Sequence, residues 1–299
     1  MAFIMVEYFE HGIVSGGNNI VLSIWESPDP EAVIVFIPAT MTHPLPYEPL
    51  LRGFAERGFA VAGLHPIGHG KSSRDVRRYS LRDIIQNAGD AVTFVIERYN
   101  KPVVVMGTSQ GGIVAAGLAS ADDRIAAVFP HNIILADLPE TITVTRFPKW
   151  LKHVYLPWLF TVRLLAFLFP DINVPLDFYL DASRIDEGGT INRIFIDDPL
   201  TLKYYSYYFL ASILATRFPG LTDGSVRCPI YVIADAGDKL FMPEYIRKVF
   251  DRLRAPHKEI IMFNTGEHLM MLTHPEEICD ALAPKIREAI VFNKNAPRV

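Results

Sequence analysis

The fold of this chain is decided by the stretch Pro102-Val103-Val104-Val105-Met106-Gly107-Thr108-Ser109-Gln110-Gly111-Gly112. The unbroken apolar run Val103–Met106 is typical of a strand buried on both faces of a parallel sheet. The residues after it match the pattern Gly-x-Ser-x-Gly, and Ile113–Leu118 begins a helix. Small residues allow a sharp strand-to-helix turn that lifts the Ser109 hydroxyl to the helix N-terminus. If Ser109 has no catalytic role, the same stretch is a glycine-rich turn in which the serine caps the following helix.

Apolar strands alternate with amphipathic helices on both sides of this turn. Buried strands are predicted at 32–37, 59–64, 125–129, 230–234 and 259–263, and helices at 46–57, 80–99, 244–253 and 275–291. Val6–Ile13 and Asn19–Trp25, joined by Ser15-Gly16-Gly17-Asn18, predict a hairpin. The alternation predicts an α/β fold with a mostly parallel sheet flanked by helices.

The alternation stops from about Asp137 to Asp223, where aromatic residues are frequent. This predicts a core domain formed by residues 1–136 and 224–299, with a helical cap inserted at 137–223. The insertion separates the strand before Ser109 from the later strands, so it must leave and re-enter the core at the carboxyl edge of the sheet.

Composition excludes several classes of protein. The 299 residues are 50% hydrophobic and 21% charged, which suits a large globular core and not a disordered chain or a fibre. A net charge of −4 predicts no nucleic-acid partner. Cys228 and Cys279 are too few for a Cys-x-x-Cys metal cluster and are expected to be small buried hydrophobes.

One segment, Trp150–Phe169, is nearly all apolar or aromatic. Pro157 interrupts it and Arg163 lies within it, so a transmembrane helix is not predicted. A cap helix that makes transient contact with a membrane surface is expected instead. Residues Met1–Glu7 lack the features of a secretory signal, which predicts a cytoplasmic protein.

Two later loops carry the partners that a serine nucleophile needs, namely a base and a carboxylate that orients it. The loop after the strand at 230–234 contains Asp235 and Asp238, and the loop after the last strand contains His268. In a parallel sheet both loops emerge at the carboxyl edge, where Ser109 lies.

The order Ser, Asp, His resembles that of the α/β-hydrolase superfamily. The resemblance covers about residues 1–135 and 224–299, and it includes the loop Gly68-His69-Gly70, in which His69 is expected to be structural. It implies three roles: nucleophile for Ser109, orienting acid for Asp238 and general base for His268. It implies no cofactor and no metal.

Asp235 is the competing acid. Asp238 is favoured because members of the family place the acid a few residues beyond the strand, before a helix led by proline such as the one at Pro243. Asp235 is then expected to cap the turn or to be solvated.

The backbone N–H of Gln110, at the start of the helix, is expected to stabilise a developing oxyanion. The family implies that the second donor is Thr40 or Met41. Relatives usually carry His-Gly where this chain has Pro38-Ala39. Alanine fits there only if its backbone avoids positive φ.

A serine nucleophile excludes the aspartate-based branches of the family and leaves esterases, lipases, thioesterases, C–C hydrolases and perhydrolases. The layout is similar to that of monoacylglycerol-lipase-like and other capped carboxylesterases. The expected substrate is a small apolar ester in a pocket lined by Met41, Trp158, Phe160 and Leu240. A catalytically silent protein that binds an apolar ligand is the alternative.

Overall fold

The computed structural model describes residues 5–76, 78–186 and 197–295. Residues 187–196 of the predicted insertion therefore lie outside the described residues. Residues 1–4, which belong to the segment predicted to lack a secretory signal, lie outside them as well.

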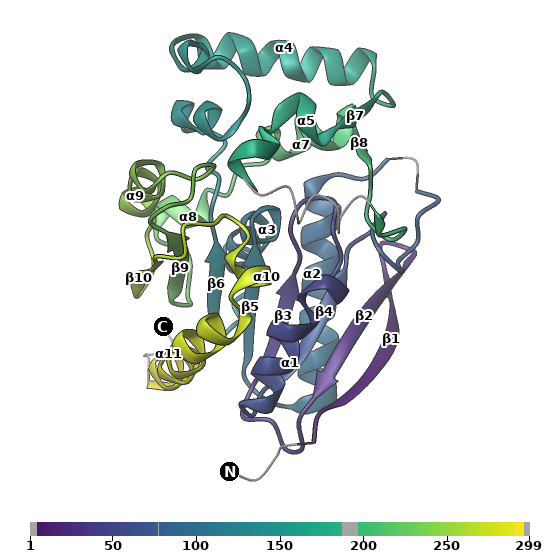
Figure 1. Ribbon diagram of the computed structural model, residues 1–299, viewed down its shortest axis with the longest axis vertical. Helices are drawn as coiled ribbons and strands as arrows, with labels where there is room; N and C mark the ends of the chain where they lie inside the picture. The colour runs from purple at the N-terminus through teal and green to yellow at the C-terminus, as the bar shows by residue number, and fades with distance from the viewer. Residues whose placement is uncertain (1–4, 77, 187–196, 296–299) are drawn as a thin grey trace.

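A twisted sheet of eight strands forms the centre of the molecule, in the order β1-β2-β4-β3-β5-β6-β9-β10 (Figure 1). The strands are β1 Glu7–Ser15, β2 Asn18–Glu26, β3 Val33–Ile37, β4 Ala60–His65, β5 Val103–Thr108, β6 Ala127–His131, β9 Ile230–Asp235 and β10 Lys258–Phe263. β2 pairs antiparallel with β1 and β4, and all the other pairs are parallel. The predicted α/β-hydrolase fold is confirmed.

Helices cover both faces of the sheet. α2 (Leu81–Tyr99), α3 (Gln110–Ala119) and α9 (Pro243–Arg252) pack on one face, and α1 (Glu48–Glu56) and α11 (Pro275–Asn295) pack on the other. Alternate residues of β3 enter the two cores, Val33 and Val35 on the first face and Ile34 and Phe36 on the second. A strand covered on both sides needs apolar residues at every position, which explains the unbroken apolar runs.

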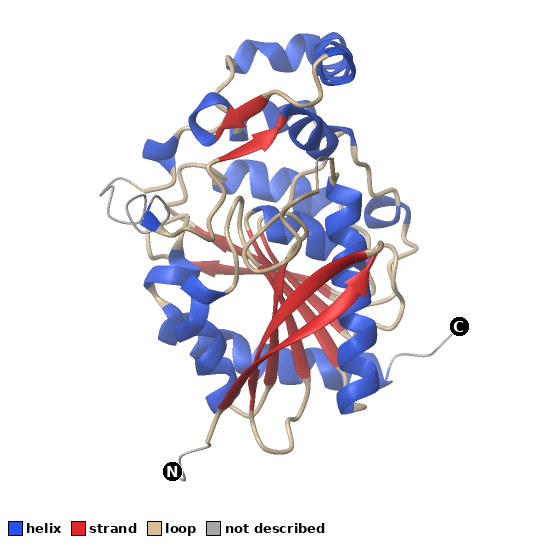
Figure 2. Cartoon of the chain, turned by 90° about the vertical axis from the view of Figure 1, so that its right-hand side faces the viewer, coloured by secondary structure: helices blue, strands red, loops and turns tan. Residues whose placement is uncertain are grey.

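The segment between β6 and β9, called here the inserted segment, lies beyond the carboxyl edge of the sheet (Figures 1 and 2). Its described elements are η2 Pro139–Val144, η3 Lys149–Val154, α4 Tyr155–Leu168, β7 Asn173–Pro175, α5 Leu176–Tyr179, η4 Ala182–Arg184, β8 Tyr204–Ser206, α7 Tyr207–Ala215 and α8 Gly220–Asp223. The described part of the inserted segment is mostly helical, and it also contains an antiparallel pair, β7 and β8, that was not predicted from the sequence (Figure 2). Strands of three residues are too short for alternation to reveal them. The boundaries 137 and 223 stay a prediction.

Helix α4 runs across the top of the molecule in Figure 1 and packs on α7. Among the described residues, one helical stretch, Lys149–Leu168, is long and apolar enough to cross a membrane by length and composition. Its outer face exposes Leu156, Phe160, Leu164 and Phe167. The rejected membrane span and the expected contact with a membrane surface both stay predictions.

Helix α3 starts so close to the strands that two glycine positions around the turn, Gly107 and Gly111, have no room for a side chain. A Cβ atom on Gly111 would lie 2.1 Å from the carbonyl oxygen of Ile37, at the end of β3. A Cβ atom on Gly107 would lie 2.1 Å from the carbonyl oxygen of Gly111. These contacts are with backbone atoms, which cannot swing away, so glycine is required at both positions.

We therefore predict that Gly111→Ala lowers the free energy of unfolding by about 3 kcal/mol or more, because the backbone must shift to relieve the overlap. Gly89→Ala is the matched control, since its Cβ would lie 3.6 Å from the nearest atom, in Leu118. That change should raise stability by about 0.5–1 kcal/mol, because alanine favours a helix interior. Urea denaturation measures both changes, and equal effects would contradict the packing described here.

Candidate active site

Ser109 lies at the tight turn between β5 and α3, with φ 51° and ψ −114°. Such a conformation costs a non-glycine residue about 1–3 kcal/mol and persists only where its surroundings impose it. Here the close start of α3 imposes it, together with a hydrogen bond of 2.9 Å from the Ser109 N–H to the carbonyl oxygen of His131. The turn holds the serine at the carboxyl edge, with 7% of its surface exposed.

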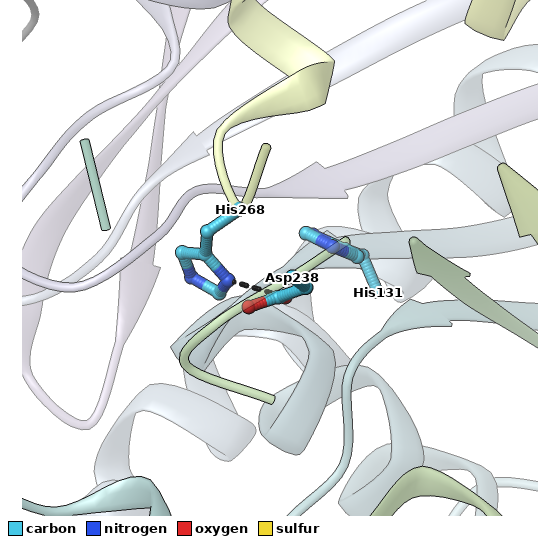
Figure 3. Close-up of side chains that lie close together, drawn as sticks. All are labelled: His131, Asp238 and His268. Atoms are coloured by element: carbon cyan, nitrogen blue, oxygen red, sulfur yellow. Dashed lines mark hydrogen bonds and ion pairs between the residues drawn. The ribbon is translucent and has the colours of Figure 1, made fainter. Parts of the chain in front are cut away.

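The structure brings Ser109, His268 and Asp238 together from three loops. Nε2 of His268 lies 3.2 Å from the Ser109 Oγ, and Nδ1 of His268 lies 2.8 Å from Oδ2 of Asp238. Figure 3 shows the pair formed by Asp238 and His268. A carboxylate only accepts hydrogen bonds, so Nδ1 carries the proton and Nε2 offers its lone pair to the serine hydroxyl.

The Asp238 carboxylate is buried and firmly held. Its Oδ1 accepts the backbone N–H groups of Leu240 at 2.7 Å and Phe241 at 2.8 Å. Burial by itself raises the pKa of Asp238, but the attraction of His268 and these hydrogen bonds outweigh it and hold the pKa below its usual range. The carboxylate is therefore ionised at neutral pH and can stabilise a positive charge on His268.

Asp235 has a different set of partners. Its Oδ1 accepts the N–H groups of Gly237 at 2.7 Å and Gly266 at 3.0 Å. Its Oδ2 accepts the N–H and the hydroxyl of Thr265 at 2.6 and 2.9 Å. Asp235 thus joins the loop after β9 to the loop after β10. It caps turns, as one of the two expectations had it, but it is buried and not solvated.

His131, the last residue of β6, and Asn132, which follows it, were not identified from the sequence. Burial, followed by the nearby His268, lowers the pKa of His131 to about 3, so its ring is neutral. His131 Nε2 accepts from the Asn132 amide at 3.1 Å, and Nδ1 lies 3.1 Å from the Thr108 hydroxyl. The same amide nitrogen lies 3.4 Å from Oδ2 of Asp238. Asn132 therefore contacts the Asp238 carboxylate, and His131 in turn holds Asn132. The place of both residues at the carboxyl edge of the sheet was the only sequence signal that could have identified them.

His131, Asp238 and His268 place possible metal ligands within 4.8 Å of one another (Figure 3). The ligating atoms already have partners, because Nδ1 of His268 faces Asp238 and Nε2 of His131 faces Asn132. A metal here would have to break the bond between His268 and Asp238. The donor set fits an orienting network better than a metal centre.

The predicted oxyanion donors lie on either side of Ser109. Gln110 is the first residue of α3, where a backbone N–H has no partner within the helix. Thr40 and Ser109 line the same two cavities. The N–H of Met41, the other candidate, donates instead to the hydroxyl of Tyr205 at 2.7 Å. Thr40 is therefore the better second donor.

Ala39 is not among the described residues with positive φ, so alanine replaces glycine there without strain. The left-handed conformation falls two residues later, at Met41, whose φ is 65°.

Comparison with known proteins agrees with the fold. The family model described as serine aminopeptidase, S33, a family of α/β hydrolases, matches residues 28–275. The chain belongs to this family. No curated protein sequence matches the hydrolase.

Solved structures share the fold at low identity. The monoacylglycerol lipase of Paleococcus ferrophilus is 18% identical with a TM-score of 0.67, over 93% of this chain and 99% of that one. A soluble variant of the monoglyceride lipase of Saccharomyces cerevisiae is 14% identical with a TM-score of 0.72, over 97% and 96%. A carboxyl esterase of Bacillus coagulans is 18% identical with a TM-score of 0.72, over 96% and 100%.

Two cavities of the hydrolase meet at Ser109, with volumes of about 280 and 270 Å³. The first, called here the apolar cavity, extends under the inserted segment and is lined by Ile113, Val144, Trp158, Leu165, Phe178 and Leu210, among others. The second, called here the polar cavity because it is the more polar of the two, reaches His268. Most of its lining is still apolar, but it includes Thr42, Asp177, Thr201 and Lys203.

The predicted pocket residues divide between these cavities. Trp158 lines the apolar cavity, Met41 lines the polar cavity, and Leu240 lines both. The prediction for Phe160 is wrong, because 67% of that residue is exposed on the outer face of α4. Two positions along a helix turn the side chain by about 200°, so Trp158 and Phe160 point in nearly opposite directions.

We predict that Asp238→Asn lowers kcat about 10⁴-fold by leaving His268 in the wrong tautomer, with the fold intact. Asp235→Asn should leave kcat within about tenfold and lower the free energy of unfolding by about 1–3 kcal/mol, because buried donors lose their acceptor. Steady-state kinetics and urea denaturation separate the two effects. The reverse pattern would make Asp235 the catalytic acid.

Proposed function

We propose that this hydrolase cleaves carboxylic esters of apolar acyl groups through an acyl-serine intermediate. The observation that carries the proposal is that hydrogen bonds join Ser109 to His268 and His268 to Asp238, and that Ser109 lines an apolar cavity. A catalytically silent protein would have no physical need for the strained Ser109 or for the buried charge of Asp238.

The reaction follows from the geometry. Ser109 Oγ attacks the acyl carbon while its proton passes to Nε2 of His268, and the N–H groups of Gln110 and Thr40 stabilise the oxyanion. His268 then gives this proton to the leaving alkoxide, and the alcohol departs. In the second half a water molecule attacks the acyl-serine, His268 takes its proton and returns one to Ser109, and the carboxylic acid is released.

The two cavities support different parts of the ester. None of the described residues that line the apolar cavity is Asp, Glu, Lys, Arg or His, so it suits an acyl chain. His268 lines the polar cavity, and the group that protonates the leaving oxygen must lie on the side of the alcohol. We therefore assign the acyl chain to the apolar cavity and the alcohol to the polar cavity.

The name of the family raises peptide hydrolysis as a second function. An aminopeptidase must bind the free α-ammonium group of its substrate, which favours a nearby carboxylate. The apolar cavity, to which the acyl part is assigned, offers no such group among its described lining residues, and Asp177 lines the polar cavity on the assigned side of the alcohol; this arrangement favours esters. Thioesterase, C–C hydrolase and perhydrolase reactions use the same triad, so a substrate panel should include a thioester and an amide beside the esters.

Trp158 should determine the preference for acyl chain length. Trp158→Ala should lower kcat/KM for an octanoate ester by about one to two decades and change the acetate ester little, since each methylene that loses its contact costs up to about 0.8 kcal/mol. Phe160→Ala is the matched control on the exposed face of the same helix and should change neither substrate. The assay is hydrolysis of p-nitrophenyl esters from acetate to octanoate.

Equal losses for acetate and octanoate in Trp158→Ala would mean that this residue stabilises the inserted segment without contacting the acyl chain. An effect of Phe160→Ala as large as that of Trp158→Ala would contradict the assignment of the apolar cavity. No turnover of any ester by the wild-type protein would contradict the proposed function itself.

A further inference from the structure

Both backbone polar groups of Met41 are bound by the inserted segment. The Met41 N–H donates to the hydroxyl of Tyr205 at 2.7 Å, and the Met41 carbonyl oxygen accepts the N–H of Leu202 at 2.9 Å. Met41 directly follows Thr40, the proposed second oxyanion donor, and its φ of 65° is one that side chains disfavour. The chain after Thr40 is thus held in a costly conformation by contacts from a segment more than 150 residues away.

The direction of the hydrogen bonds at Tyr205 is fixed by its other neighbour, His69. Nδ1 of His69 lies 2.8 Å from the carbonyl oxygen of Ile67, which can only accept, so Nδ1 carries the proton. Burial lowers the pKa of His69 to about 4, so the ring is neutral and Nε2 is an acceptor. Nε2 lies 2.8 Å from the Tyr205 hydroxyl. Tyr205 therefore donates to His69 and keeps its lone pairs for the Met41 N–H.

The side chains of this network are buried. Tyr205 is 1% exposed, and its ring packs on Phe209 at 4.3 Å and on His69 at 5.5 Å between ring centroids. Burial raises the pKa of Tyr205 well above its usual value, so its hydroxyl stays protonated. A buried N–H that lost this acceptor would be left without a partner and would drive the loop to rearrange.

We propose that Tyr205 is a positioning residue for the oxyanion hole: its hydroxyl fixes the peptide plane between Thr40 and Met41, which adjoins the Ala39–Thr40 plane that carries the Thr40 N–H. This inference rests on the proposed function. The Gly68-His69-Gly70 loop then has a defined task, which is to present Nε2 of His69 to Tyr205. The inserted segment accordingly has two roles. It lines the apolar cavity, and through Tyr205 it positions the Thr40 N–H that donates to the oxyanion.

The test is Tyr205→Phe, which keeps the ring in the core and removes the hydroxyl. We expect kcat to fall about tenfold to a hundredfold, less than for outright loss of an oxyanion donor, with KM changed by no more than about threefold. Affinity for an alkyl boronic acid, whose adduct with Ser109 places an oxygen in the oxyanion hole, should fall in parallel with kcat/KM. Tyr204→Phe, the neighbouring and exposed tyrosine, is the matched control and should match the wild type.

Two further measurements separate positioning from general loosening. The ratio of octanoate to acetate turnover should stay at the wild-type value in Tyr205→Phe, because the wall of the apolar cavity is unchanged. His69→Leu, which removes the acceptor for Tyr205, should lower kcat in the same way, and His69→Gln, which restores an acceptor oxygen, should recover part of it.

An active wild-type enzyme whose Tyr205→Phe variant keeps its kcat and its boronate affinity would overturn the inference and leave the proposed function standing. A variant whose loss is confined to KM or to the chain-length ratio would overturn it too, because the hydroxyl would then act on the cavity wall. A wild-type protein without esterase activity would overturn the proposed function first.

Discussion

The close approach of Gly111 to the Ile37 carbonyl oxygen is the contact on which the rest of the site depends. It brings the first turn of α3 against the end of β3, which forces Ser109 into its positive-φ conformation. The loop that carries Thr40 leaves β3 at the same point, so the contact also fixes the separation between the nucleophile and one oxyanion donor. A single backbone contact therefore positions two parts of the catalytic machinery.

The positions of Ser109, Asp238 and His268 could be predicted from sequence because they depend on short-range features. Each follows an apolar strand, and the carboxyl ends of parallel strands meet at one edge. In the structure Asp238, and not Asp235, is hydrogen-bonded to His268, and the burial of Asp235 was not foreseen. Proximity to a strand does not show that Asp235 accepts four hydrogen bonds from two loops.

The residues that sequence reasoning missed depend on long-range packing. Phe160 and Trp158 are both aromatic and two positions apart, and only the rotation of α4 against α7 decides which enters the apolar cavity. β7 and β8 are three residues each and pair across the inserted segment. The hydrogen bond between Tyr205 and Met41 joins residues that are 164 positions apart, and nothing in the sequence around Met41 indicates Tyr205 as its partner.

The inserted segment binds the loop that follows β3 through its own backbone and side chains, and under the proposed function it therefore serves the catalytic site as well as covering it. The central claim is that Ser109 is the nucleophile of this arrangement. Labelling with an octyl fluorophosphonate, followed by peptide mass spectrometry, tests it most directly. The account predicts a single adduct on Ser109 that is absent from Ser109→Ala and forms far more slowly in His268→Ala. An adduct on another residue, or none on an enzyme that still hydrolyses esters, would contradict it.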